Sequence, residues 1–138
     1  MRILLDTHTL LWWLIKSPLL PTSVQNLMER PDRVVFVSAV SGWEMATKLR
    51  LGKLNIAADV VQNFMVHLAN ERFEVLSVSV QNGIAAGLLP GPHKDPFDRM
   101  LIAQALAENI PIVSNDRALD GYGVKRLWSL GKPPSLRP

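Results

Sequence analysis

Short apolar runs alternate along the chain with longer stretches of mixed apolar and polar residues. Apolar runs rich in leucine, isoleucine and valine are typical of buried strands, whereas the longer stretches carry helix start and stop signals. Ser38 is a predicted N-cap of a helix that ends at Gly52, and Asp95 and Pro96 open another helix. The pattern predicts strands at residues 2–5, 34–37, 75–80, 111–114 and 124–127, and helices at 7–16, 22–30, 38–52, 58–70, 79–88 and 95–108.

Strands that are apolar throughout and separated by helices indicate a parallel sheet with helices on both faces. We therefore predict an α/β fold that forms one domain over residues 1–138. Residues from about 131 to 138 include three prolines and are expected to form an extended C-terminal tail. Ligands of such sheets bind at the carboxyl ends of the strands, so the polar residues there are the first candidates for a functional site.

The composition restricts the structural class and the cellular compartment of the protein, but it does not indicate a function. The 138 residues are 48% hydrophobic and 20% charged, which is typical of a folded domain and excludes disorder. The absence of cysteine excludes disulfides and thiol catalysis, and it agrees with a reducing compartment. Because we find neither a signal segment nor an apolar run of the ~20 residues that cross a bilayer, we expect a cytoplasmic protein that does not associate with membranes.

Four acidic residues lie where the predicted sheet would gather them at one edge. Asp6 ends the first strand, and Asp116 follows the strand at 111–114. Glu44 lies early in the helix after the second strand, and Asp98 lies in the first turn of the helix that leads to the fourth strand. Helices that return antiparallel to the strands begin at the carboxyl edge of the sheet, so all four carboxylates are expected there.

These acids also have purely structural interpretations. Asp98 suits the positive end of its helix dipole, and Asp116 fits a turn. Glu44 and Lys48 have the i,i+4 spacing of a surface ion pair. An acid that closes a buried apolar strand, as Asp6 does, is harder to explain in this way. The joint arrangement therefore favours a site over four separate structural roles.

Four carboxylates in one pocket repel one another unless a cation neutralises them or some of them are protonated. A pair of like charges at ~4 Å is unfavourable by about 4 kcal/mol at an effective dielectric constant of 20. Oxygen ligands without histidine or cysteine select hard cations, so Mg²⁺ or Mn²⁺ is favoured. Metal sites of this kind hydrolyse phosphodiesters by metal-activated water.

Four sequence features flank or contain these acids: DTHTLLW starting at Asp6, Glu44 in the second strand–helix unit, HKDPFDRMLIAQA starting at His93, and VSND ending at Asp116. Together they resemble the motifs of the PIN-domain nucleases and, more narrowly, of the VapC-type toxins of bacterial type II toxin–antitoxin pairs. The resemblance covers essentially the whole chain. It implies a three-layer α/β/α fold with a five-stranded parallel sheet of order 3-2-1-4-5.

The same resemblance implies a Mg²⁺- or Mn²⁺-dependent endoribonuclease with an RNA substrate. It also implies a homodimer and a cognate VapB-type antitoxin that neutralises the toxin. Asp95 is assigned to the helix N-cap rather than to metal. The positions that match the family's site are Asp6, Glu44, Asp98 and Asp116 for the catalytic and metal-binding acids, and Thr7, Ser114 and Asn115 for the polar residues that support them.

Basic residues near the acids are candidates for contacts with RNA phosphates. The net charge of the chain is +3, and with the four acids set aside the remaining surface is about +7, which suits a polyanionic substrate. Arg99 and Arg117 each follow one of the four acids, and Lys48 lies one helical turn after Glu44.

Two other functions fit parts of the sequence. The chain can be a non-catalytic module that binds an antitoxin and acts as co-repressor of its operator. It can also be a phosphatase that uses Asp6 as nucleophile, but that chemistry needs a second acid two residues later, where this chain has His8. RNA cleavage by the antitoxin-free protein distinguishes a nuclease from both alternatives.

Overall fold

The computed structural model describes residues 1–56 and 58–129, and within them the chain forms a five-stranded parallel sheet. Its order, β3-β2-β1-β4-β5, confirms the predicted topology. The first strand is therefore central, and the carboxyl ends of all the strands lie at the same edge. The strands are β1 (Arg2–Leu5), β2 (Val34–Ser38), β3 (Glu74–Leu76), β4 (Ile112–Val113) and β5 (Arg126–Leu127).

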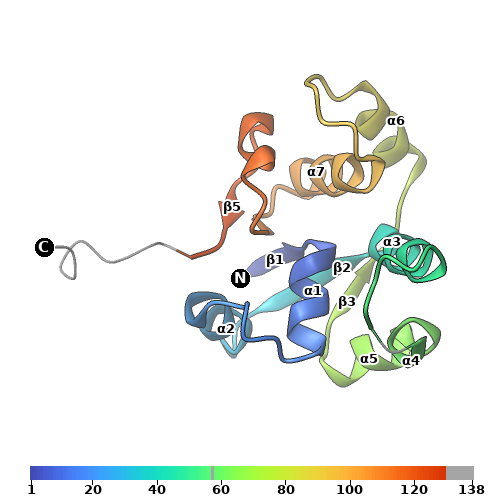
Figure 1. Ribbon diagram of the computed structural model, residues 1–138. Coiled ribbons are helices and arrows are strands. Elements are labelled where there is room, and N and C mark those ends of the chain that lie inside the picture. The colour runs from blue at the N-terminus through green and yellow to red at the C-terminus, as the bar shows by residue number, and fades with distance from the viewer. Residues whose placement is uncertain (57, 130–138) are drawn as a thin grey trace, which may run out of the picture.

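Helices cover both faces of the sheet (Figure 1). Side chains alternate along β1, so Ile3 and Leu5 belong to one buried apolar cluster and Leu4 to another. Met45 and Val40 of one helix, α3, lie in different clusters. This arrangement is the predicted three-layer α/β/α fold. The first cluster packs on α1 (Thr7–Leu14), α2 (Thr22–Met28), α3 (Ala39–Arg50) and α5 (Phe64–Asn70), and the second on α3, α7 (Pro96–Glu108) and the 3₁₀ helix η1 (Arg117–Tyr122).

The helix predicted at 58–70 is two helices, α4 (Ala58–Gln62) and α5. The break occurs at Asn63, whose backbone angles (φ −110°, ψ 32°) are not helical. The side-chain amide of Asn63 donates a hydrogen bond to Asp59 at 2.5 Å. Asparagine competes for local hydrogen bonds in this way, which explains why the apolar pattern continues through the break while the backbone does not.

The strand predicted at 75–80 is shorter in the structure, where β3 ends at Leu76. Ser79 and Asn82 form a capping box that starts α6 (Val80–Leu88), which confirms the helix predicted at 79–88 and excludes the overlapping end of the predicted strand. The helix η1 after β4 was not predicted. Its N-cap is Asp116, which accepts a hydrogen bond from the backbone of Ala118.

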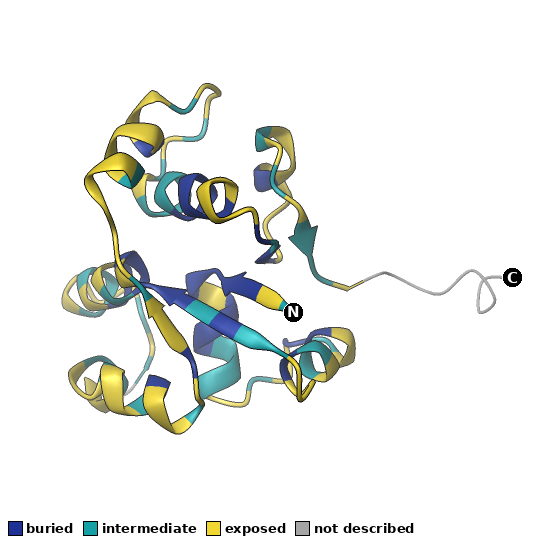
Figure 2. Ribbon diagram, turned by 180° about the vertical axis from the view of Figure 1, so that it is seen from behind, coloured by how far each residue is buried: buried dark blue, intermediate teal, exposed yellow. Residues whose placement is uncertain are grey.

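Burial follows the layers of the fold. Figure 2 shows buried residues on β1 and on the helix faces turned toward the sheet, with exposed residues on the outer faces. Within the described residues, no helix combines the length and apolar composition that crossing a bilayer requires. The tail predicted at about 131–138 lies outside the described residues.

Candidate functional site

Asp6 and Asp116 leave neighbouring strands at the carboxyl edge of the sheet. β1 pairs with β4 so that Leu5 lies opposite Val113, and this register places Asp6 beside Ser114. The Ser114 hydroxyl is hydrogen-bonded to Asp6 and accepts a hydrogen bond from the backbone N–H of Asp116 at 3.0 Å. Ser114 therefore links the two acids through its hydroxyl. Both acids line one cavity of about 410 Å³, together with His8, Trp12, Asn115 and Arg117.

Asp6 has a structural role as well as a place in this cavity. It is the N-cap of α1, where its carboxylate accepts a hydrogen bond from the backbone N–H of Thr9 at 2.8 Å. The Thr9 hydroxyl donates to the carbonyl of Val113 at 2.9 Å and ties the start of α1 to β4. Burial raises the pKa of Asp6, and the hydrogen bonds from Ser114 and Thr9 oppose that effect. This carboxylate is thus held rigidly in a desolvated position.

Glu44 is buried, with only 2% of its surface exposed. The Thr7 hydroxyl donates to one carboxylate oxygen of Glu44 at 2.5 Å, and the Lys48 ammonium forms an ion pair with the other. The predicted i,i+4 pair therefore exists, but it is not a surface pair. Lys48 neutralises a buried acid, and this placement does not support its interpretation as an RNA contact.

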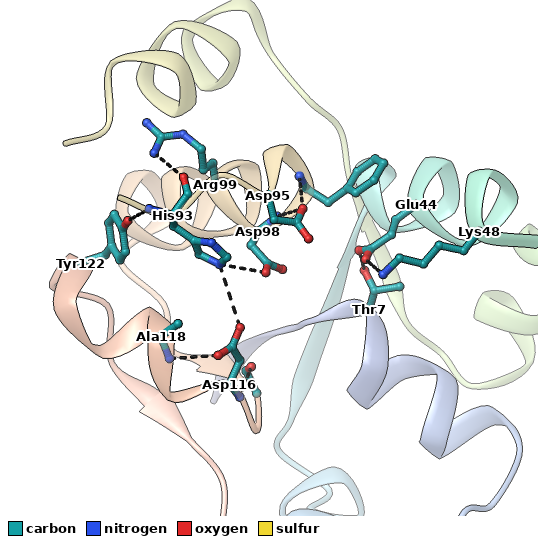
Figure 3. A network of polar contacts seen from close by, with 12 residues as sticks. Thr7, Glu44, Lys48, His93, Asp95, Asp98, Arg99, Asp116, Ala118 and Tyr122 are labelled. Atoms are coloured by element: carbon teal, nitrogen blue, oxygen red, sulfur yellow. Dashed lines mark hydrogen bonds and ion pairs between the residues drawn. The ribbon is translucent and has the colours of Figure 1, made fainter. Parts of the chain in front are cut away.

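Asp98 lies between the other acids (Figure 3). Its pKa is raised to about 6, first by burial and then by the negative charges of Asp95, Glu44 and Asp116, while His93 acts in the opposite direction. The structure therefore brings Glu44, Asp98 and Asp116 within electrostatic reach of one another. A carboxyl with a pKa raised by neighbouring carboxylates marks a place where a cation is favoured.

His93 contacts two of the acids and was assigned no role by the sequence analysis. Its Nε2 lies 3.0 Å from Asp98 Oδ2 and 4.0 Å from Asp116 Oδ2 (Figure 3). In the described residues, the group of ligand-type side chains whose donor atoms all lie within 4.8 Å consists of these three. Asp6 and Glu44 stand outside this group, and an imidazole stands inside it.

The position of His93 close to Asp98 in the sequence could have marked it as a site residue, but hydrophobic periodicity gives no information about loop residues. His93 opens the HKDPFDR stretch, five residues before Asp98, but it lies in a loop where no strand or helix pattern orients its side chain. Only the packing of η1 beside α7 brings it between acids from two elements.

Arg99 is placed differently from the expectation that it contacts RNA. Its guanidinium donates to the backbone carbonyls of Ala86, His93 and Leu89, with a longer contact of 3.5 Å to Gly87. These acceptors occupy its donors and tie α7 to the end of α6 and to the loop that follows. The structure thus supports a positioning role for Arg99 instead of a phosphate contact.

Two further expectations can be compared with the structure. Asp95 is the N-cap of α7, as predicted, and accepts from the backbone N–H groups of Phe97 and Asp98 at 2.8 and 3.3 Å. Arg117 is exposed at the rim of the cavity that Asp6 and Asp116 line, where a phosphate can approach it.

Known proteins are similar to this chain in sequence. A family model described as "PIN domain" matches residues 3–125. The chain is 28% identical over 123 residues to Ribonuclease VapC22 of Mycobacterium tuberculosis (strain ATCC 25618 / H37Rv), which covers 87% of this chain and 91% of that protein.

Two solved structures share the fold at lower identity. VapBC2 from Rickettsia felis, bound to a DNA fragment from its promoter, has a TM-score of 0.70 at 19% identity, covering 94% of this chain and 100% of that chain. VapBC-1 from nontypeable Haemophilus influenzae has a TM-score of 0.59 at 19% identity, with coverages of 92% and 97%.

Proposed function

This chain belongs to the PIN domain family, and on that premise we propose that it is a divalent-metal-dependent endoribonuclease, the toxin of a type II toxin–antitoxin pair. The observation that carries the proposal is the position of Asp98. Its carboxyl is partly buried among Glu44, Asp116 and Asp95, at the carboxyl edge of a parallel sheet, and its pKa is raised to about 6. Such an arrangement of acids is unfavourable in isolation and favourable around a divalent cation.

The donor set fits a divalent ion. Carboxylate oxygens of Asp98 and Asp116 face the same space, and Asp6 shares a cavity with Asp116. We propose these three aspartates as metal ligands, with Glu44 as the fourth acid of the site. A bound Mg²⁺ or Mn²⁺ would polarise a phosphodiester and lower the pKa of a water molecule.

Other residues would serve the substrate or the geometry of the site. Thr7 and Lys48 hold the Glu44 carboxylate in place, and Ser114 sets the spacing of Asp6 and Asp116. Asn115 and Arg117 line the cavity and are exposed, so we propose them as contacts with the RNA backbone.

The proposal includes the partners expected of such a toxin. We propose that the protein is cytoplasmic, forms a homodimer, and is neutralised by a small VapB-type antitoxin encoded beside it. The relatives named VapBC support the antitoxin as partner. Co-expression with the product of an adjacent short reading frame, followed by co-purification, tests this part of the proposal.

The central test is RNA cleavage by the full chain purified without antitoxin. We expect cleavage of total RNA in Mg²⁺ or Mn²⁺, none in EDTA, and a loss of orders of magnitude in Asp116→Asn. The matched control is Asp59→Asn, which removes an exposed carboxylate on α4 and should leave cleavage unchanged. If no divalent ion supports cleavage by the wild-type protein, the nuclease proposal is wrong and the co-repressor alternative gains support.

A further inference from the structure

An imidazole stands among the acids of the proposed metal site. We propose that His93 is itself a ligand of the divalent ion, beside Asp98 and Asp116, and that it shifts the preference of the site from Mg²⁺ toward transition-metal ions such as Mn²⁺ and Co²⁺. This inference rests on the proposed function, because it names the metal selectivity of that same site. It adds a ligand that the set of four acids does not contain.

The backbone around His93 is held from two sides. Its N–H donates to the Tyr122 hydroxyl at 2.8 Å, and its carbonyl accepts from the Arg99 guanidinium at 3.0 Å (Figure 3). Tyr122 belongs to η1 and Arg99 to α7, so the elements that carry Asp116 and Asp98 also fix His93. The backbone of His93 is therefore fixed by the fold, and its imidazole extends from a fixed point toward Asp98 and Asp116.

Gly91 shows how closely this loop is fitted to Tyr122. Its φ is +108°, a conformation that other residues rarely adopt, and a Cβ atom there would lie 2.7 Å from the Tyr122 hydroxyl oxygen. The close approach brings Tyr122 within reach of the His93 N–H. The loop thus depends on a glycine whose absence would move the tyrosine that anchors His93.

The distances from His93 to the two aspartates lie in the range found between donors that share one ion. Donor atoms that are neighbours around an octahedral ion with bonds of 2.0–2.1 Å lie about 3.0 Å apart, and opposite donors about 4.2 Å apart. His93 Nε2 lies 3.0 Å from Asp98 Oδ2 and 4.0 Å from Asp116 Oδ2. With Asp98 and Asp116, the three donor atoms lie within 4.8 Å of one another, close enough to approach one ion.

Ligand chemistry then sets the selectivity. Mg²⁺ prefers oxygen ligands and retains its water, whereas imidazole nitrogen suits transition-metal ions, whose affinity rises from Mn²⁺ to Co²⁺. A nitrogen ligand from His93 should therefore favour Co²⁺ more than Mn²⁺, and Mn²⁺ more than Mg²⁺. The competing explanation is that His93 is only a counter-ion that holds Asp98 and Asp116 together.

The test measures metal binding rather than activity. Full-length protein is freed of metal with EDTA and dialysed, and its affinities for Co²⁺ and Mg²⁺ are measured by calorimetry for the wild type and His93→Asn. We expect His93→Asn to lose about tenfold or more in Co²⁺ affinity and less than about threefold in Mg²⁺ affinity. Folding of the variant is checked by its melting temperature in EDTA, since its backbone contacts to Tyr122 and Arg99 do not need the imidazole.

His67→Asn is the matched control. His67 Nε2 lies 3.0 Å from Asp59, so this variant also breaks a histidine–aspartate pair, but one outside the proposed site. A second readout reports the bond itself, because an imidazole bound to Co²⁺ gives a strongly shifted, exchangeable N–H proton resonance. That resonance should be present in the wild type and His67→Asn and absent in His93→Asn.

The outcomes distinguish the proposal that His93 is a ligand from the proposal of a metal-dependent nuclease. Selective loss of Co²⁺ affinity together with loss of the shifted resonance establishes His93 as a ligand. Equal losses for both ions, no loss, or a resonance that persists in His93→Asn overturns the inference and leaves the nuclease proposal standing. If the wild type binds neither ion, the proposed metal-dependent function fails first.

Discussion

Asp98→Asn should leave the metal-free protein as stable as the wild type or more stable, while it abolishes most RNA cleavage. The physical reason is that burial, and then the charges of three nearby carboxylates, raise the pKa of Asp98 to about 6. Asparagine has nearly the same shape and no charge, so it avoids both the desolvation of a charge and the repulsion. It also removes a proposed metal ligand, so cleavage in Mg²⁺ should fall by orders of magnitude.

The magnitude follows from the pKa. A rise from 3.8 to about 6 corresponds to at most about 3 kcal/mol at about 1.4 kcal/mol for each unit. The Asp98 side chain is 22% exposed, and solvent screening reduces this figure to about 1–2 kcal/mol. The charge effect of His93 is already contained in this pKa, but the hydrogen bond between His93 and the carboxylate is weaker with a neutral amide, which offsets about 1 kcal/mol of the gain. We therefore expect a net change in the free energy of unfolding of about 0 to +1 kcal/mol, or up to about 3–5 °C in melting temperature.

The pH dependence has a definite sign. Because the pKa of Asp98 is higher in the folded state, folding favours its protonated form. In the metal-free wild type, the penalty is fully present above pH about 6 and disappears as the pH falls toward 3.8. The stability advantage of Asp98→Asn over the wild type should therefore be largest above pH about 6 and vanish near pH 4.

Asp95 supplies the comparison, since it caps the same helix. Asp95→Ala removes the acceptor for the N–H groups of Phe97 and Asp98 and should lower the free energy of unfolding by ~0.5–2 kcal/mol. Asp95→Asn keeps a capping side chain and removes the charge, so it separates the two effects. Both Asp95 variants should retain much of the cleavage activity.

Thermal melts in EDTA, paired with RNA cleavage in Mg²⁺, measure all of these variants. A destabilised but active Asp98→Asn beside a stable but inactive Asp95→Ala would refute the reasoning, because the metal ligand would then be the other aspartate. A stability difference that does not change between pH 4 and 8 would refute the electrostatic explanation alone.

Three further predictions concern metal, RNA and the arginines. Mg²⁺ or Mn²⁺ added after EDTA treatment should restore cleavage, and full activity in EDTA would contradict a metal mechanism. RNA binding by inactive Asp6→Asn protein should weaken steeply as salt is raised, and an affinity independent of salt would show that the basic surface has no role. In that background, Arg117→Ala should reduce the salt slope by about 1. Arg99→Met should instead leave the slope unchanged and lower the free energy of unfolding by at least about 1.5 kcal/mol in a denaturant titration; the reverse pattern would restore Arg99 as an RNA contact.

The sequence alone determined the layers of the fold and the edge at which the acids lie. These features depend on local and repetitive signals, namely buried apolar strands, amphipathic helices, and caps such as Ser38 and Asp95. Parallel strands share a direction, so the position of Asp6 or Asp116 after a strand already places it at the carboxyl edge. Such inferences do not need the contacts between distant side chains.

Local hydrogen bonds of polar side chains explain why some predicted helix and strand boundaries were wrong. Apolar periodicity continues through Asn63, although a side-chain hydrogen bond to Asp59 breaks the helix there. The strand predicted at 75–80 overlapped the helix predicted at 79–88, whereas in the structure β3 ends at Leu76 and Ser79 caps the helix. Hydrophobic pattern reports which face is buried, whereas a few polar atoms decide where the backbone changes direction.

Tertiary packing decided the detailed chemistry of the candidate site. Lys48 was equally suited to RNA or to Glu44, and the burial of Glu44 required a cation at its side. Arg99 was diverted to carbonyls at the end of α6, and His93 was brought between Asp98 and Asp116 by a loop fitted to Tyr122. Loop residues and long side chains have many local conformations of similar energy. Only contacts from other elements select one of these conformations, so the fold as a whole, and not the neighbouring sequence, sets the ligands that a metal ion would meet.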